Sequence, residues 1–174
     1  MAIIKPNNNT ISAITALPAA IATGKVLQVV TGTTTTRVES SSSTYADTNL
    51  SVTITPSSSS NKILITPSFS TSHSVANSHG IKLVRDTTDI FIADDSDGGL
   101  RKYVTTWTYG GGGARAVTQS FEYVDSPSTT SATTYKLQIW ATGGTAYLNQ
   151  MGVDSNNTTY GRSASSIIAY EIAG

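Results

Sequence analysis

The chain has 174 residues, and its eleven basic and eleven acidic side chains give a formal net charge of zero. This length suits one domain with a single packed core. The balanced charge offers no electrostatic attraction to nucleic acid or to an anionic membrane. The absence of cysteine excludes disulfide bonds and thiolate metal sites. We therefore expect no nucleic-acid partner, no membrane partner and no cofactor.

Serine and threonine dominate the composition. The chain has 24 Ser and 28 Thr, about 30% of its residues, whereas charged residues are only 13%. Threonine is β-branched and favours strands. Disordered segments usually combine high net charge with few aromatics, but here the net charge is zero and aromatics occur along the whole chain. The composition indicates a folded, all-β protein with a neutral, hydroxyl-rich surface.

Residues 1–24 differ in pattern from the rest of the chain. Pro6, Pro18 and an asparagine run interrupt the segment, and its apolar residues show no strand alternation. Lys5 follows only three apolar residues, whereas a secretion signal places its charge before a longer apolar core, so we expect synthesis in the cytoplasm. The segment has more large apolar side chains than a solvated tail usually has. They are Ile3, Ile4, Ile11, Ile14 and Leu17. We predict an extended arm at residues 1–24 that docks on a sister subunit or another protein.

From Lys25 onward the pattern predicts short strands. Leu50, Val52 and Ile54 alternate with polar residues, which is typical of a half-buried strand. Segments expected to form strands are 26–30, 50–55, 62–66, 81–85, 90–92, 103–109, 116–123, 135–140, 146–149 and 166–172. Residues 86–89 and 142–145 have the composition of hairpin turns. We predict one domain over residues 25–174, an antiparallel, jelly-roll-like β-sandwich.

The acidic segment Asp94-Asp95-Ser96-Asp97-Gly98-Gly99 resembles a binding loop more than any other segment does. Several carboxylates in one loop can gather calcium, which takes six to eight oxygen ligands. The spacing does not fit the EF-hand loop, and the closing glutamate is missing. The competing interpretation is a polar hairpin tip, because aspartate and glycine suit turns. We expect no metal here, and we keep Asp94, Asp95 and Asp97 as candidate ligand-binding residues.

His73 and His79 are the two histidines of the chain. On a loop, they could face one another around a threefold axis and hold a metal or sense pH. Because no third ligand is evident, we expect surface histidines instead, kept as candidate binding residues.

Nothing in the sequence predicts a catalytic site. Neither histidine lies near a nucleophile elbow, and no G-x-S-x-G occurs. A hydrolase built on two carboxylates would need a pair from Asp47, Asp86, Asp89, Glu122, Asp125 and Glu171 across a cleft. We predict no catalytic residues and no enzyme.

Tyr103, Trp107 and Tyr109 precede the glycine run Gly110–Gly113. Aromatic side chains on one strand face can stack on a sugar, lie in a subunit interface or belong to the core. We take Trp107 and Tyr109 as candidate sugar-binding residues. Binding is expected in the loops 74–80, 94–100 and 110–115, because loops at one end of a sandwich vary without disturbing the sheets.

Several stretches together resemble a family of small virion proteins of tailed phages, notably cyanophages and other aquatic phages. These stretches are MAIIKPNNNTISAITALPAAIATGKVLQV, YADTNLSVTITPSSSSNKILI, LVRDTT, YVDSPSTTSATTYKLQI and SSIIAYEIA. Members are usually described as virion structural, tail-fibre or fibre-like proteins, and some phages use comparable β modules as head decoration. The resemblance implies a structural component of the virion, assembled in the host cytoplasm, whose partners are other tail, baseplate or capsid proteins. It brings no catalytic residues.

Two functions from different classes remain open. The first is a fibre or fibre-tip module for host attachment, with distal loops that bind a host-surface glycan. The second is a head decoration (cement) protein, whose arm stabilises the capsid without any ligand. By analogy with β-sandwiches at phage surfaces, we predict a homotrimer in either case.

Overall fold

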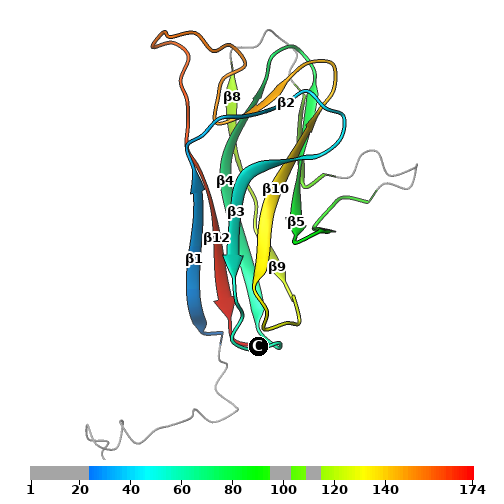
Figure 1. Ribbon diagram of the computed structural model, residues 1–174, viewed down its shortest axis with the longest axis vertical. Helices are drawn as coiled ribbons and strands as arrows, with labels where there is room; N and C mark the ends of the chain where they lie inside the picture. Colours follow the sequence, from blue (N-terminus) through cyan, green and yellow to red (C-terminus); the bar gives the residue numbers. More distant parts are fainter. Residues whose placement is uncertain (1–23, 95–102, 109–114) are drawn as a thin grey trace, which may run out of the picture.

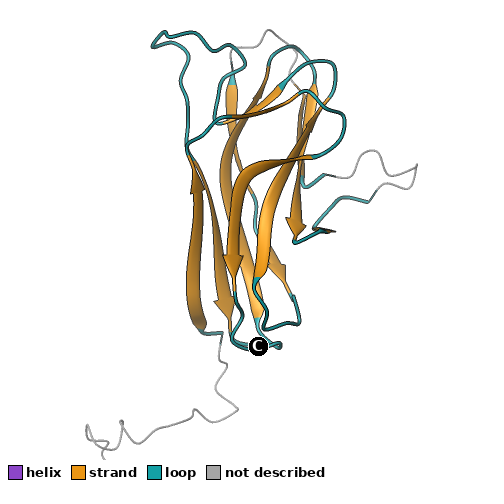
Figure 2. Ribbon diagram, viewed as in Figure 1, coloured by secondary structure: helices purple, strands orange, loops and turns teal. Residues whose placement is uncertain are grey.

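A computed structural model of the chain describes residues 24–94, 103–108 and 115–174, with only the backbone course for 106–108. Every regular element in these ranges is a β-strand (Figure 2). The strands, in chain order, are β1 Val26–Thr34, β2 Val38–Ser40, β3 Ala46–Ile54, β4 Lys62–His73, β5 Ser78–Arg85, β6 Thr88–Ile90, β7 Thr105–Thr108, β8 Ala116–Ser120, β9 Tyr123–Asp125, β10 Thr133–Ala141, β11 Ala146–Leu148 and β12 Ser165–Ile172. Within the described ranges, no helix is long and apolar enough to cross a membrane.

The strands form two antiparallel sheets that pack face to face along the long axis of the molecule (Figure 1). Sheet A has the order β1-β12-β4-β11-β2, and β8 and β9 also pair with β4. Sheet B has the order β3-β10-β5-β6, and β7 also pairs with β5. The predicted antiparallel β-sandwich is therefore confirmed, whereas its jelly-roll connectivity stays a prediction.

The core lies between the two sheets and follows from the alternation of side chains along each strand. In β10, Tyr135, Leu137 and Ile139 are fully buried, and the residues between them are partly exposed. Leu50, Val52 and Ile54 of β3 are buried in the same way, as their spacing predicts. Burying each large aliphatic side chain contributes roughly 1.5–3 kcal/mol, so the core within the described residues accounts for much of the folding free energy.

Strand β4 is the centre of sheet A because it has partners on both edges. Along one edge, β9 pairs with its first part and β8 with its last part. Pro67 lies between these two contacts, and it has no amide hydrogen to donate to a neighbouring strand. The pairing register is the same on both sides of this gap, so Phe121 and Glu122, which separate β8 from β9, lie opposite Pro67 and Thr66. The proline thus accounts for the break between the two short strands.

Strands β1 and β3 approach closely and close one side of the sandwich. A side chain at Gly32 of β1 would overlap the backbone oxygen of Ser51 in β3, so only glycine allows this approach. β1 has a second neighbour, β12, with which it pairs along most of its length. The earliest and the latest of the described strands are therefore adjacent in sheet A (Figure 1).

Of the two predicted hairpin turns, one is confirmed and the other is wrong. The predicted turn at 86–89 joins β5 to β6 but is shorter, because Thr88 and Asp89 belong to β6: Arg85 pairs with Thr88, and Asp86 has a positive φ of 53°. The segment 142–145 joins β10 of sheet B to β11 of sheet A, so it crosses between the sheets. This segment also forms a backbone hydrogen bond outside any hairpin, because the Ser74 amide donates to the Thr145 carbonyl over 2.8 Å. The predicted boundary at residue 24 stays a prediction, because residues 1–23 lie outside the described chain.

Candidate functional site

The strongest candidate site is a group of three aromatic rings on the outer face of sheet B. Trp140 belongs to β10 and points outward because its neighbour Ile139 points into the core. Tyr45 immediately precedes β3, and Tyr103 lies just before β7. All three side chains are partly exposed. We call Tyr45, Tyr103 and Trp140 the aromatic platform.

The rings of the platform contact one another in well-defined geometries. Tyr103 and Trp140 stack with their centroids 5.6 Å apart and their planes 24° apart. Tyr45 meets Trp140 edge to face, with a centroid distance of 6.4 Å and an interplanar angle of 73°. Gly80 of β5 leaves room for both neighbours, because a side chain there would fall on Trp140 and within 2.5 Å of Tyr103. Packing therefore fixes the orientation of the rings before any ligand binds.

A lysine extends the platform on one side. Lys82 of β5 places its ammonium 4.3 Å from the ring centroid of Tyr45, within cation–π range. The same ammonium forms an ion pair with Asp89 at 2.8 Å. Burial raises the pKa of Tyr45 well above its ordinary value, so its hydroxyl stays protonated at neutral pH. Lys82 and Asp89 carry opposite charges and Tyr45 is neutral, so this edge of the platform is polar but has no net charge.

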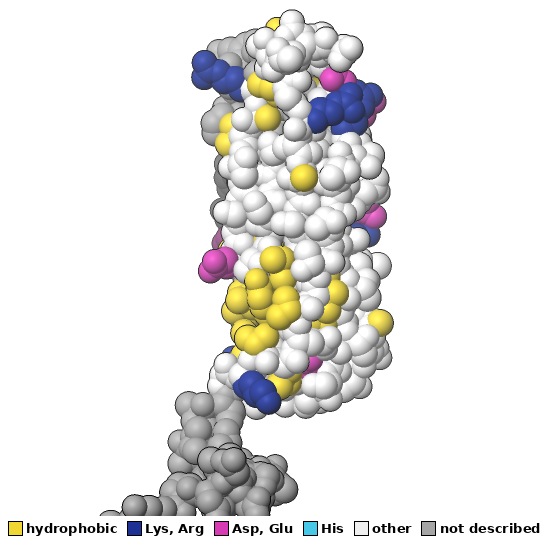
Figure 3. Space-filling view, turned by 90° about the vertical axis from the view of Figure 1, so that its left-hand side faces the viewer, with side chains coloured by type: hydrophobic (Ala, Val, Ile, Leu, Met, Phe, Trp, Pro, Cys, Tyr) yellow, Lys and Arg dark blue, Asp and Glu magenta, His cyan; other side chains and the backbone are white. Residues whose placement is uncertain are grey.

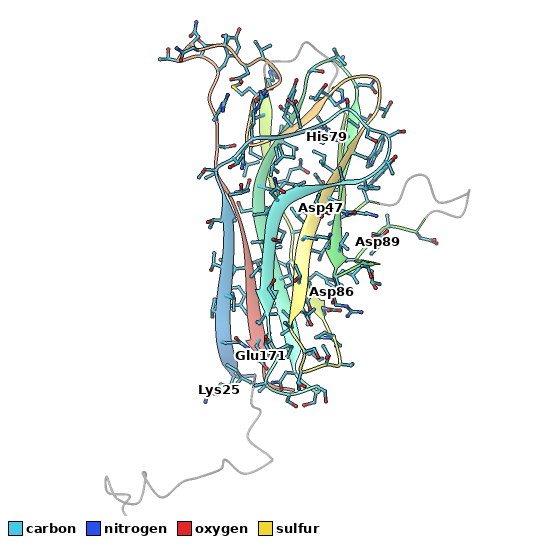
Figure 4. All side chains as sticks on the ribbon, in the orientation of Figure 1. Lys25, Asp47, His79, Asp86, Asp89 and Glu171 are labelled. Carbon is cyan, nitrogen blue, oxygen red and sulfur yellow. The ribbon has the colours of Figure 1, made fainter. Side chains whose placement is uncertain are left out.

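A row of polar side chains runs beside the platform across sheet B. Gln138 of β10 pairs with Asp47 of β3 on one side and with Lys82 of β5 on the other. Asp47 accepts from Lys136 at 2.9 Å and from Gln138 at 2.6 Å. The hydrogen bond from Lys136, followed by that from Gln138, lowers the pKa of Asp47. Asp47 and Asp89 are labelled on this face in Figure 4.

The two histidines are not on the surface, so that prediction is wrong. His73 ends β4 and His79 lies in β5, and their exposed fractions are 2% and 0%. Their rings stack across the two sheets, with centroids 6.0 Å apart and planes 17° apart. His79 is labelled near the upper end of the sandwich in Figure 4. A ligand on the surface has no access to either ring as they stand here.

The histidine pair belongs to a buried polar network that links the sheets. His79 Nε2 lies 2.9 Å from the hydroxyl of Thr71, and Gln119 donates to that hydroxyl over 2.6 Å. Thr105 in turn donates to Gln119 over 2.6 Å. Burial, and then the neighbouring His73, lower the pKa of His79 to about 4. Burial also lowers the pKa of His73, so both rings are neutral at neutral pH.

The structure describes only some of the other site residues that the sequence predicted. Asp94 is exposed, and it lies close to the platform because the Ala93 amide donates to the Tyr103 carbonyl over 3.2 Å. Trp107 lies in β7, where only its backbone is described. The predicted residues outside the described chain are Asp95, Asp97, Tyr109, Ile3, Ile4, Ile11, Ile14 and Leu17.

Asp125 and Glu171, two of the acidic residues considered for a hydrolase, each have their own hydrogen-bond partners. Asp125 accepts two hydrogen bonds from Arg85 at 2.9 Å and one from the Tyr135 hydroxyl at 2.7 Å. Glu171 lies in the same sheet, on the other side of β4 from Asp125, and it accepts hydrogen bonds from the Asn61 side chain and the Ser57 amide. Among the described residues, no three histidine, aspartate or glutamate side chains gather as they would around a metal ion.

The sequence predicted Trp107 and Tyr109 as sugar-binding residues, and none of the three platform rings was among the candidates. Tyr103 lies near the glycine run in the sequence, but its ring stacks on Trp140, 37 residues further along the chain. The alternation in β10 already places Trp140 on the outer face. Nothing local indicates that Tyr45 reaches the same place, because that contact depends on the pairing of β3 with β10.

A hollow separate from the platform lies in the loop that precedes β12. Its volume is about 440 Å³, and its lining is Asp154, Ser155, Asn156, Asn157, Tyr160 and Arg162. Arg162 and Arg37 both contact Asp154, at 2.6 and 3.3 Å. This hollow is polar and contains a single aromatic ring, so it offers no stacked surface comparable to the platform.

A group of partly exposed aromatic rings beside hydrogen-bonding groups suits a ligand with both apolar and hydroxyl faces, and a sugar ring has both. Nothing in this arrangement resembles an activated nucleophile or an acid–base pair across a cleft. Compared with known proteins, the chain matches no family model and no curated protein.

Proposed function

We propose that the protein is a non-enzymatic structural component of a phage particle, and that its aromatic platform binds a neutral glycan of the host surface. The sequence resemblance to small virion proteins supports the first part of the proposal. The platform carries the second part, because its stacked rings stand beside a row of donors and acceptors on an exposed sheet face.

The chemistry of the platform favours a neutral sugar over an anion. The ring faces of Tyr103 and Trp140 provide an apolar surface for the C–H face of a pyranose. The nearby Asp47 and Gln138 offer an acceptor and an amide for its hydroxyl groups. Lys82 is paired with Asp89, so it does not leave an unbalanced positive charge for an acidic ligand.

Replacing Trp140 with alanine tests the proposal directly. Loss of a stacking ring worth about 1.5 kcal/mol weakens sugar binding roughly tenfold. Binding is measured against an array of neutral oligosaccharides, and then as adsorption to host cells. Trp140→Phe keeps an aromatic face and is expected to retain most of the affinity.

Tyr160→Ala provides the matched control, because Tyr160 is a partly exposed aromatic residue in the separate polar hollow. It is expected to bind normally. Thermal unfolding of each variant shows whether it is still folded. The glycan proposal fails if Trp140→Ala stays folded and binds as the unchanged protein does, or if Tyr160→Ala alone loses binding.

The place on the particle decides between a fibre and a decoration protein. Antibodies against the protein are expected to label purified particles in electron microscopy, and absence of label from every particle would contradict a virion role. Hundreds of copies per particle indicate head decoration, whereas a few tens or fewer indicate a fibre, which we favour. In solution we expect a homotrimer; sedimentation as a monomer across micromolar concentrations would exclude it.

A further inference from the structure

An apolar row crosses the outer face of sheet A near its base. Val29 of β1 pairs with Tyr170 of β12, Tyr170 pairs with Leu64 of β4, and Leu64 pairs with Val124 of β9. Directly paired residues point to the same side of a sheet, with their Cβ atoms about 5 Å apart. Val29 is 54% exposed and Val124 is 48% exposed, so both ends of the row face solvent. We call these four residues the apolar row.

The row continues into further apolar surface on one side and borders a partly polar hollow on the other. Val26 and Leu27 at the start of β1 are also exposed, and Figure 3 shows hydrophobic side chains gathered low on this side of the molecule. Beyond Leu64, toward the upper end, a hollow of about 650 Å³ lies over the break between β8 and β9. Thr66, Phe121 and Ile168 are among the residues that line it. Exposed apolar side chains gathered on one sheet face are typical of a surface that contacts a partner.

The composition of residues 1–23 fits this surface. The isoleucines and leucine of this segment do not alternate with polar residues as the apolar residues of the strands do. Lys5 is the one charged side chain in the segment. The hollow also has one charged residue in its lining, Glu122, whose sign is opposite. The fit in length is ample: 23 residues extend up to about 75 Å, whereas four neighbouring strands span only about 15 Å.

The position of Gly24 indicates whose arm covers the row. The Lys25 carbonyl accepts a hydrogen bond from Ala173 at 2.9 Å, and Val26 pairs with Ile172, so β1 begins at the base of sheet A. Lys25 is labelled at this end in Figure 4. The chain enters β1 at the base and runs up the sheet, so an arm that covered its own row would have to turn back along the sheet before Lys25. Reaching an adjacent molecule requires no reversal.

We propose that residues 1–23 of one copy dock on the apolar row of a neighbouring copy. Such a contact joins two different surfaces, so it closes into a ring when the rotation between copies allows it. The inference rests on the apolar row and on the arm's composition, and it stands whether or not the protein belongs to a virion.

The absence of cysteine from the chain makes cross-linking a sharp test. Full-length Ile14→Cys protein is mixed with full-length Val124→Cys protein, and a short bismaleimide is added. The expected product is a dimer joined through positions 14 and 124, identified by peptide mapping. Val153→Cys is the matched control, because Val153 is an exposed valine in the loop before β12. The product through position 124 is expected to exceed the product through position 153 several-fold.

The doubly substituted chain, Ile14→Cys with Val124→Cys, separates the remaining possibilities at low protein concentration. A cross-link within one chain, with none between the two singly substituted chains, would show that the arm covers its own row and would overturn the proposal. Equal yields at positions 124 and 153, or no cross-link at either, would show that the arm does not dock on the row. Because Val124 is half exposed, the substitution leaves the core intact.

Discussion

Glu171 is a carboxylate with an exposed fraction of 1%, and among the described residues its charge is stabilised by hydrogen bonds. Asn61 donates to it over 2.5 Å, Gln28 over 2.6 Å, and the Ser57 amide over 2.6 Å. Burial opposes the charge, but these bonds outweigh it and lower the pKa of Glu171 to about 2 from the ordinary 4.5. These contacts tie β12 to β1 and to the turn before β4 at the base of the sandwich.

We predict an acid-induced loss of stability from this carboxylate. Between pH 4.5 and about 2 the unfolded chain binds the proton more readily than the folded chain. The stabilising contribution is therefore present above pH 4.5 and is lost as the pH falls toward 2. Urea unfolding of the unchanged protein and of Glu171→Gln across this range measures the effect. The variant is expected to show a shallower pH dependence and, at neutral pH, to be about 2 kcal/mol less stable, because its amide faces donors.

Glu122→Gln is the control for this experiment, since Glu122 is exposed. It is expected to leave both the slope and the neutral-pH stability unchanged. If the free energy of unfolding depends on pH equally in Glu171→Gln and in the unchanged protein, the hydrogen-bond donors do not stabilise the ionised carboxylate as described.

His79 predicts a second, separate pH window. Its pKa is about 4 in the folded chain, against an ordinary 6.5. Because the unfolded chain binds the proton more readily between these values, full stability is present above pH 6.5 and decreases as the pH falls to 4. His79→Gln keeps a polar group near Thr71 but does not titrate, so its free energy of unfolding should change less over this window. A slope identical to that of the unchanged protein would contradict the prediction.

At the scale of elements, the contact between β1 and β3 depends on a single missing side chain. Gly32→Ala places a methyl group against the Ser51 carbonyl, which forces the two strands apart. We predict a loss of about 1–3 kcal/mol, the usual range for overpacking, measured by urea unfolding. Gly161→Ala is the control, because no atom lies within 4 Å of the added carbon, and it is expected to be neutral. A neutral Gly32→Ala would mean that the strands separate without cost.

Most strands could be predicted from the sequence, although β2 at Val38–Ser40 was not, and strand pairing could not be predicted. The period-two patterns of β3 and β10 show directly in Leu50, Val52 and Ile54 and in Tyr135, Leu137 and Ile139, and their burial is confirmed. The glycines at 143 and 144 predict a tight turn equally well for a hairpin and for a crossing between sheets. Only the long-range pairing of β11 with β4 decides between them, and no local pattern carries that information.

The same limit explains which site residues were found. The histidines lie in a serine- and threonine-rich stretch, where polar side chains point both inward and outward, so alternation gives no sign that they are buried. Their burial becomes clear only when β4 and β5 are brought together from different sheets. The aromatic platform likewise requires three strands that are distant in the sequence, although the outward direction of Trp140 follows from β10 alone.

At the scale of the whole molecule, the described residues between Val30 and Ala169 pack a hydrophobic core between the two sheets. We predict that a chain lacking residues 1–24 folds and unfolds cooperatively at a midpoint close to that of the full chain, but no longer associates or joins its assembly. Urea unfolding measures the first property, and sedimentation and incorporation into particles measure the second. If the shortened chain is unfolded, residues 1–24 belong to the core and the boundary is wrong.

The pairing of β1 with β12 has a consequence for how the protein is made. Of the described strands, β1 leaves the ribosome earliest and β12 latest, yet each needs the other, and β4 also needs β12. Until β12 emerges, the nascent chain exposes the unpaired edges of two strands and half of an apolar interior. Folding of sheet A is therefore delayed until nearly all of the described chain has been synthesised, and long-range antiparallel pairing of this kind is slow. Chaperone demand and losses to aggregation during synthesis are expected to depend on the last eight residues of the sheet more than on any loop.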